Sequence, residues 1–255
     1  MNIEAGDVPE RLSGALTADS LTFVRGGALR ASLRGAALRI VDANHVILGR
    51  PAVDFTAVSP NVRCTVVRFA GFGPGPGHEI GIRLCPSAMY LAHWMLLDRA
   101  GDRMHAAAQL EGAARDVARV CRVASISEHA RRVGVYVSSA LHEAGNRRLS
   151  LDALAASLSL SRFTVSHLFS EYAGITLRLY HRRLRMRLAL ELLREAPVQL
   201  TALALELGFS DQAHFSNTFH AEYGIAPSLL RGNAALSRAM IRKRRVALLP
   251  RMETP

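Results

Sequence analysis

The sequence from Leu200 to Pro227 predicts two short helices held at a fixed angle by one tight turn. The first helix has a single apolar face at the spacing of an α-helix, made by Leu200, Leu203, Ala204 and Leu207. Gly208 follows at the point where this helix must end, because glycine adopts the left-handed conformation of helix ends at little cost. Ser210 or Asp211 can then cap the next helix by accepting hydrogen bonds from its free backbone N–H groups.

The second helix of this pair has two unlike faces. Its packing face is aromatic and repeats every four residues, with Phe215, Phe219 and Tyr223. The opposite face of its first two turns is small and polar, with Gln212, Ala213, Ser216 and Asn217. A solvated helix face would have the same composition, but a polar N-terminal face behind a glycine turn is typical of helices that read bases in the major groove.

Residues 151–172 repeat this plan. The packing helix has Leu151, Leu154, Ala155 and Leu158, and the turn is Ser159–Leu160–Ser161. The following helix packs with Val165, Leu168, Phe169 and Tyr172, and it exposes Arg162, Phe163, Ser166 and His167. Between the two units, residues 177–195 predict one long helix whose inward side is leucine-rich. Its outer side is expected to carry Arg178, Arg182, Arg183, Arg185 and Arg187.

The distribution of charge points to a polyanionic partner for this part of the chain. The chain of 255 residues has a net charge of +11. Residues 146–255 hold 16 Lys and Arg against 8 Asp and Glu, whereas residues 1–145 hold 16 against 13. A basic excess gathered in one region favours binding to nucleic acid. The basic run 242–245 is expected to belong to a solvated extension covering residues 233–255.

The N-terminal part predicts a different architecture. Short segments rich in β-branched residues occupy 21–24, 37–41, 46–48, 53–58 and 64–69, separated by turns such as Asp42–Asn44. Their spacing indicates a small antiparallel sandwich or barrel. Helical periodicity then takes over at 87–99, 105–122 and 128–144. A polar stretch at 144–148 marks the expected linker. The fold class is therefore α+β, with an N-terminal unit over 1–145 and an all-α unit over 146–232.

Several classes of protein are excluded. No apolar run approaches the roughly 18–20 residues that span a bilayer, and the acidic N-terminus does not read as a secretory leader. Three widely spaced cysteines without a CxxC pair favour a reducing compartment, and we expect a cytoplasmic protein. The N-terminal histidines have no metal-ligand spacing, so neither a metal site nor a cofactor is expected; they are His45, His78, His93 and His105.

Residues 149–231 resemble the DNA-binding domain of the AraC/XylS family of bacterial transcription regulators. The resemblance rests on Leu203–Ala204 and the string GFSDQAHFSNTFHAEYGIAPSLLR over 208–231, where helix, glycine turn, recognition helix and closing Gly-x-x-Pro occur in register. The first unit departs from the family at Ser159, where glycine is usual, which predicts a strained turn or a rotated first recognition helix. The segment 23–69 loosely resembles the compact, cupin-like β sensor domain of one branch of the family.

The resemblance implies two major-groove contacts about one helical turn apart on double-stranded promoter DNA. By position, the base-reading residues would be Gln212, Ala213, Ser216 and Asn217, with Arg162, Phe163, Ser166 and His167 in the first unit. By type, Gln212 and Asn217 suit adenine and Arg162 suits guanine or phosphate. The phosphate-contacting residues would be Arg178, Arg182, Arg183, Arg185, Arg187 and His214. The N-terminal unit would sense a small molecule or a partner, and helices 87–144 would mediate a homodimer; contact with RNA polymerase is a further expectation.

Two other functions are compatible with parts of this pattern. A cupin-like β-domain would suit an enzyme, although no nucleophile or metal-ligand constellation supports one, and we expect no enzymatic activity. A protein whose helix-turn-helix face has lost specific DNA binding would instead engage a regulator or RNA polymerase, and the Ser159 departure favours that alternative.

Overall fold

The computed structural model describes residues 2–6, 17, 19–33, 35–49, 53–59, 61–69, 81–97, 103–119, 126–143, 149–195 and 198–230. The expected linker at 144–148, His78 and the extension 233–255 lie outside these described residues. Within them the chain is α+β, with antiparallel sheets in the N-terminal part and helices alone in the C-terminal part, as the sequence predicts.

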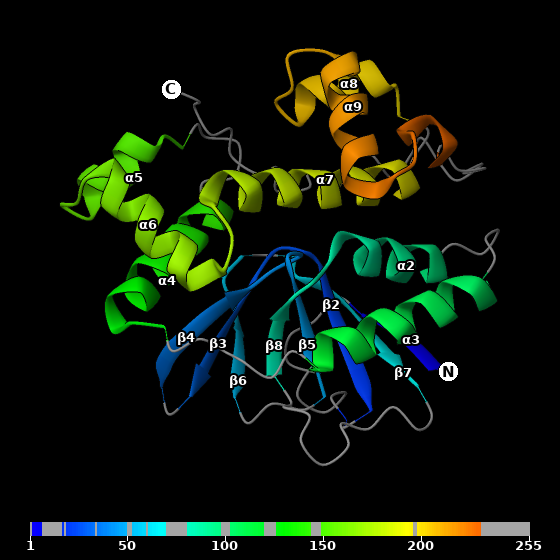
Figure 1. Ribbon diagram of the computed structural model, residues 1–255, viewed down its shortest axis with the longest axis horizontal. Helices are drawn as coiled ribbons and strands as arrows, with labels where there is room; N and C mark the ends of the chain where they lie inside the picture. The colour runs from blue at the N-terminus through cyan, green and yellow to red at the C-terminus, as the bar shows by residue number, and fades with distance from the viewer. Residues whose placement is uncertain are drawn as a thin grey trace.

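The β-region consists of two antiparallel sheets (Figure 1). The five-stranded sheet has the order β1-β7-β2-β5-β8, built from β1 (Asn2–Gly6), β7 (Arg63–Arg68), β2 (Ser20–Gly26), β5 (His45–Leu48) and β8 (Gly81–Leu84). The three-stranded sheet has the order β4-β3-β6, built from β4 (Ala36–Val41), β3 (Leu29–Leu33) and β6 (Asp54–Ala57). Strands β1, β3 and β8 were not among the predicted segments.

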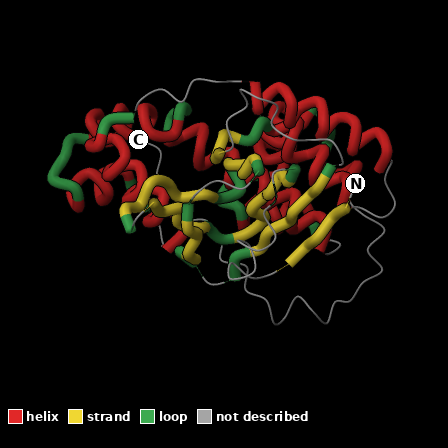
Figure 2. The backbone as a smooth tube through the Cα atoms, turned by 90° about the horizontal axis from the view of Figure 1, so that it is seen from below, coloured by secondary structure: helices red, strands yellow, loops and turns green. Residues whose placement is uncertain are grey.

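Both faces of the five-stranded sheet are covered, because alternate side chains along a strand point to opposite faces. On one face, Val24, Ile47 and Val66 join an apolar cluster with residues of the three-stranded sheet. On the other face, Phe23 and Val46 join a larger cluster with the helices. The sequences of these strands are therefore nearly continuous apolar runs. Figure 2 shows the strands gathered between two groups of helices.

Three helices follow the strands: α2 (Ser87–Leu97), α3 (Arg103–Arg119) and α4 (Glu128–Glu143). Helix α3 packs on α2 through small residues and one leucine, with Ala106, Leu110, Ala114 and Ala118 buried. Trp94 of α2 is buried, and its Nε1 donates a hydrogen bond of 2.9 Å to the carbonyl of Leu190.

The C-terminal helices are α5 (Leu151–Ser157), α6 (Arg162–Ala173), α7 (Leu177–Glu195), α8 (Leu200–Glu206) and α9 (Gln212–Tyr223), closed by the 3-10 helix η2 (Pro227–Leu230). Helix α7 lies across the end of the sheets, with α5 and α6 near one end and α8 and α9 near the other (Figure 1). One apolar cluster contains residues of the β-strands and of all five α-helices named here. The two predicted units therefore share one core.

Tyr172 shows how closely α6 is joined to the N-terminal part. Its ring lies directly against Gly134 of α4, so that a β-carbon added at Gly134 would overlap the ring. Its hydroxyl accepts a hydrogen bond of 2.8 Å from the backbone N–H of Ile40. Arg39 donates to the carbonyl of Tyr172 at 3.1 Å and places its guanidinium 5.2 Å from the ring centroid. Helix α6 is thus fixed to both β4 and α4.

This contact predicts opposite effects for two glycine substitutions in helix interiors. Gly134→Ala should lower the free energy of unfolding by about 1–3 kcal/mol, because the added methyl group has no room beside Tyr172. Gly112→Ala in α3 should raise it by roughly 0.5–1 kcal/mol, because a β-carbon there meets nothing within 4 Å and alanine favours the helix. Denaturant unfolding of both variants provides the measurement. Equal stabilisation of the two would contradict the packing of α6 on α4.

Candidate nucleic-acid interface

The two helix-turn-helix units have the same turn despite different residues at its centre. In the second unit Gly208 has φ +79°, and the backbone N–H of Phe209 donates to the carbonyl of Ala204 at 2.9 Å. In the first unit Ser159 has φ +53°, and the N–H of Leu160 donates to the carbonyl of Ala155 at 2.9 Å. The predicted strain at Ser159 is confirmed, since a left-handed conformation costs an L-residue roughly 1–2 kcal/mol. The first unit nevertheless keeps the turn.

Each recognition helix begins with a side-chain cap. Asp211 Oδ1 accepts a hydrogen bond of 2.7 Å from the backbone N–H of His214, and this bond lowers the pKa of the Asp211 carboxyl. Ser161 Oγ accepts from the N–H of Thr164 at 3.0 Å. These caps satisfy backbone donors that a helix leaves free at its start. Of the two cap candidates considered for α9, Asp211 is therefore the cap.

The predicted base-reading residues lie on the uncovered sides of α6 and α9. Gln212, Ala213 and Asn217 are exposed and Ser216 is half-buried, while the aromatic face of α9 is buried. In α6, Arg162, Phe163 and His167 are exposed and Ser166 is half-buried. Phe163 is 81% exposed, which is unusual for a large apolar side chain, and its ring is parallel to that of His167 at 6.3 Å.

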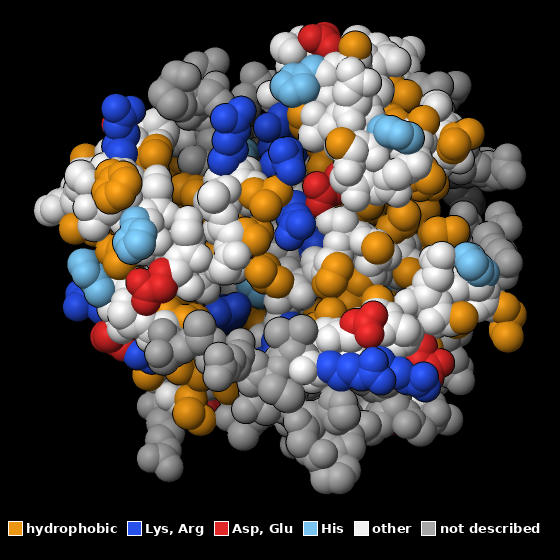
Figure 3. Space-filling view, in the orientation of Figure 1, with side chains coloured by type: hydrophobic (Ala, Val, Ile, Leu, Met, Phe, Trp, Pro, Cys, Tyr) orange, Lys and Arg blue, Asp and Glu red, His pale blue; other side chains and the backbone are white. Residues whose placement is uncertain are grey.

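The arginines of α7 do not form the single exposed row that the sequence predicts. Arg178 and Arg182 are exposed. Arg183 is a quarter exposed, and its Nε lies 3.2 Å from Glu222 Oε1. Arg185 is half-buried, with its guanidinium 3.9 Å from the ring centroid of Phe209. Figure 3 shows Lys and Arg side chains gathered between the two helix-turn-helix units.

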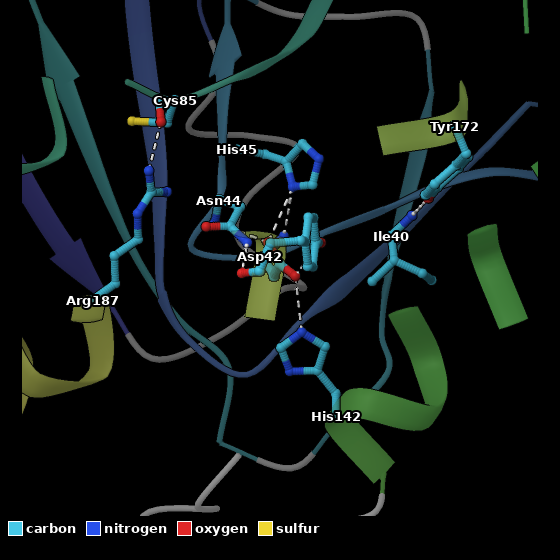
Figure 4. Close-up of polar contacts among 9 residues, drawn as sticks. Ile40, Asp42, Asn44, His45, Cys85, His142, Tyr172 and Arg187 are labelled. Carbon is cyan, nitrogen blue, oxygen red and sulfur yellow. Dashed lines mark hydrogen bonds and ion pairs between the residues drawn. The ribbon is translucent and has the colours of Figure 1, made fainter. Parts of the chain in front are cut away.

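The prediction that Arg187 contacts phosphate is wrong. Its side chain is 1% exposed, and Nη2 donates a hydrogen bond of 2.5 Å to the carbonyl of Cys85 (Figure 4). The guanidinium also lies 4.7 Å from the ring centroid of Tyr90. Arg187 shares a helix face with the buried residues Tyr180, Leu184 and Glu191, and this face packs on the N-terminal part. This second covered face of α7 was not predicted from the sequence.

His214 lies at the edge of the exposed face of α9. Its Nδ1 is 3.3 Å from Ser210 Oγ, and its ring meets that of Phe209 edge-on at 5.1 Å. The ring is exposed, so a phosphate contact stays a prediction.

A buried carboxylate joins α7 to the β-region (Figure 4). Asp42, in the turn between β4 and β5, accepts hydrogen bonds from the backbone N–H of Asn44 at 2.8 Å and from the hydroxyl of Tyr180 in α7. His45 Nδ1 lies 3.1 Å from its Oδ1, and His142 Nε2 of α4 lies 3.0 Å from its Oδ2. Burial opposes the charge, but the bonds from His142 and His45 prevail and hold the pKa of Asp42 far below its usual range. Burial lowers the pKa of His45.

Further polar contacts hold α7 and α9 against the N-terminal part. Glu191 of α7 is fully buried and lies 2.7 Å from Arg25 of β2 and 2.9 Å from Arg194. Glu222 of α9 accepts a hydrogen bond from Ser87 at the start of α2. From the sequence, Asp42 was assigned only to a turn, and Arg25, Glu191 and Glu222 had no predicted role. Charge patterns do not reveal pairs separated by more than a hundred residues.

Neither a membrane span nor a three-ligand metal cluster occurs in the described part of the chain. Of the histidines considered as metal ligands, His45 bonds Asp42, His93 is stacked on Phe23 at 4.1 Å between ring centroids, and His105 lies 2.8 Å from Gln109 Nε2.

Residues 154–233 match the family model of a helix-turn-helix domain. Over 80 residues, 31% of this chain, the sequence is 39% identical to the HTH-type transcriptional activator RhaS of Shigella boydii serotype 18 and 38% identical to RhaS of Escherichia coli strain K12 / DH10B. The match spans 29% of the length of those relatives.

Solved structures of such regulators are also similar to this chain. A transcriptional regulator with an AraC-type DNA-binding domain from Chromobacterium violaceum shares 28% identity, with a TM-score of 0.38 over 43% of this chain and 97% of that chain. ToxT from Vibrio cholerae O395 shares 12% identity, with a TM-score of 0.34 over 92% of this chain and 95% of that chain.

The Asp42 cluster predicts a specific dependence of stability on pH. Because the folded protein holds the pKa of Asp42 below its value of about 3.9 in an unfolded chain, its contribution is present above about pH 4 and is lost as the pH falls further. Asp42→Asn should therefore cost about 2–4 kcal/mol of unfolding free energy at pH 7 and progressively less below pH 4.

Denaturant unfolding between pH 7 and pH 3 measures this difference. Asp54→Asn, an exposed carboxylate of β6, is the control and should change stability by less than about 0.5 kcal/mol. A cost of Asp42→Asn that stays constant down to pH 3 would show that the carboxylate is not held charged in the folded protein.

Proposed function

We propose that the chain is a sequence-specific, DNA-binding transcription regulator of the AraC type, because residues 154–233 match the model of a helix-turn-helix domain and resemble transcriptional activators. Its two recognition helices, α6 and α9, would read two adjacent major-groove segments. This function involves no enzymatic step, in keeping with the transcriptional activators that the chain resembles.

The observation that carries this proposal is the pair of uncovered faces on α6 and α9 in one framework. Both helices follow the same hydrogen-bonded turn, both are capped at the end that would meet DNA, and arginines lie between them (Figure 3). A helix N-terminus with exposed polar groups is the part of a helix-turn-helix motif that meets base edges.

Bases would be read by side chains on the uncovered sides of α6 and α9, and phosphates would be bound by arginines of α7 and by His214. The base-reading set is Gln212, Ala213, Ser216, Asn217, Arg162, Phe163, Ser166 and His167. Phe163 is suited to the methyl group of thymine, because its large apolar side chain is 81% exposed. Arg178 and Arg182 are the best placed for phosphate, with Arg183, Arg185 and His214 in secondary positions; Arg187 has no such role.

The N-terminal part, residues 1–145, would be the sensor and dimerisation unit, cupin-like in its β-region, and residues 146–232 the DNA-binding unit. The contacts of the N-terminal part with α6, α7 and α9 support a controlling role for it, because a change in the β-region would reach both recognition helices. The effector would be a small molecule or a partner protein, and a homodimer would form through the helices of residues 87–144. The partners of the protein would be promoter DNA and RNA polymerase, and its location would be the cytoplasm.

Selection of binding sites from random duplex DNA by the full-length protein, at near-physiological salt, tests this function. We expect enrichment of a site with two boxes about one helical turn apart. Enrichment of a single box would restrict base reading to one unit. A folded protein that enriches no site would overturn the proposal and favour a protein-binding role for the helix-turn-helix face.

Two substitutions should separate base reading from phosphate binding. Asn217→Ala should relax the preference at one base pair, at a cost of about 1–3 kcal/mol for the preferred base, and leave the salt dependence of binding unchanged. Arg182→Ala, the control, should weaken binding to all sequences alike and reduce the slope of log affinity against log salt by about 1. Binding titrations at several salt concentrations give both quantities. An unchanged base preference for Asn217→Ala would contradict the placement of α9 in the groove.

A further inference from the structure

One contact recurs at the same place in both helix-turn-helix units. In the first unit Asp152, the second residue of α5, has its Oδ1 3.2 Å from Nε of Arg162, the first residue of α6. In the second unit Thr201, the second residue of α8, donates from Oγ1 to Oε1 of Gln212, the first residue of α9, at 2.6 Å. The residue types differ in every position, but the geometry is repeated.

We propose that Asp152 and Thr201 are specificity-determining positioning residues, each fixing the hydrogen-bonding edge that Arg162 or Gln212 presents to a base. This inference rests on the proposed function, because it assigns the base preference of the two recognition helices. Asp152 and Thr201 touch no base themselves; they act through the residue that they hold.

In the first unit the contact leaves one edge of the guanidinium free. The Asp152 carboxylate lies at Nε, so in this proposal the two terminal nitrogens of Arg162 are the donors offered to a base. Two parallel N–H donors match the O6 and N7 acceptors of guanine, which is the usual bidentate partner of arginine. Arg162 and Asp152 are 57% and 71% exposed, so their pairing adds little to folding stability and its effect is on orientation. Asp152 therefore selects guanine over a phosphate contact for Arg162.

In the second unit the contact changes which base suits Gln212. Bidentate reading of adenine requires the amide oxygen to accept from N6 while the amide nitrogen donates to N7. Thr201 of α8 donates to this oxygen, so in this proposal the NH₂ group is the part of the side chain offered to the base. An outward donor matches guanine, whose N7 and O6 both accept. The pair thus favours guanine, in place of the adenine expected from the residue type alone.

Competition binding by the full-length protein on its selected site tests this inference. The base pair read by Gln212 is first identified as the position where Gln212→Ala loses its preference. At that position the wild type should prefer guanine to adenine by about tenfold. Thr201→Val, which keeps the shape and removes the hydroxyl, should abolish or reverse this preference, whereas Thr201→Ser should retain it.

Two comparisons separate positioning from a general structural effect. In the Gln212→Ala background, Thr201→Val should have no further effect on base preference, because Thr201 acts through Gln212. Asp152→Asn should lower the guanine preference at the base pair read by Arg162 by about tenfold and leave the other positions unchanged. Thermal unfolding of each variant should match that of the wild type, since all four side chains are exposed.

The outcomes also separate this inference from the proposed function. A wild type with a selected site that prefers adenine opposite Gln212, or a Thr201→Val variant with the wild-type preference, would overturn the inference and leave the regulator function intact. A wild type with no preferred site would overturn both.

Discussion

The burial of α7 on two faces is the constraint on which the arrangement of this molecule depends. One face closes the cores of the two helix-turn-helix units, as in a helix that simply links them. The second face, with Tyr180, Leu184, Arg187 and Glu191, packs against the N-terminal part. Because α6 is fixed to α4 and β4 as well, and α9 to α2, the N-terminal part contributes directly to the relative position of the two recognition helices (Figure 1).

The polar contacts in this packing determine the position of α7 on the N-terminal part more than they add to the stability of the fold. Buried ion pairs such as Arg25–Glu191 gain little net stability, because the loss of hydration offsets their attraction, but breaking one partner away is costly. Asp42 is similar: its charge is tolerated only while His45, His142 and Tyr180 surround it. Docking of α7 is therefore either complete or unfavourable. Under the proposed function, a ligand that disturbs this contact would act on α6 and α9 together.

Local structure could be predicted from the sequence, whereas contacts between residues far apart in the chain could not. Caps, turns and apolar periodicity are properties of neighbouring residues, and they predicted both helix-turn-helix units and the left-handed Ser159. Strand β3 was not predicted, because only Leu29 and Ala31 reach the core. Arg30 and Leu33 are exposed, so the pattern of buried residues in this strand is short. Arg187 was misplaced because an arginine in a leucine-rich helix normally faces water, and nothing local shows that Tyr90 and the carbonyl of Cys85 would cover it. The contact between Thr201 and Gln212 was also out of reach of the sequence, because it depends on the packing of α8 against α9.

We infer that the docked α7 holds α6 and α9 in one fixed relation before DNA is bound. The most direct test is the distribution of distances between spin labels at Ala156→Cys and Ala221→Cys, two exposed positions in the separate units, with Cys121 replaced by serine. Pulsed electron spin resonance on the full-length protein without DNA should give one narrow distance. A broad or multiple distribution would contradict the claim, because it would mean that the two units move independently until DNA brings them into register.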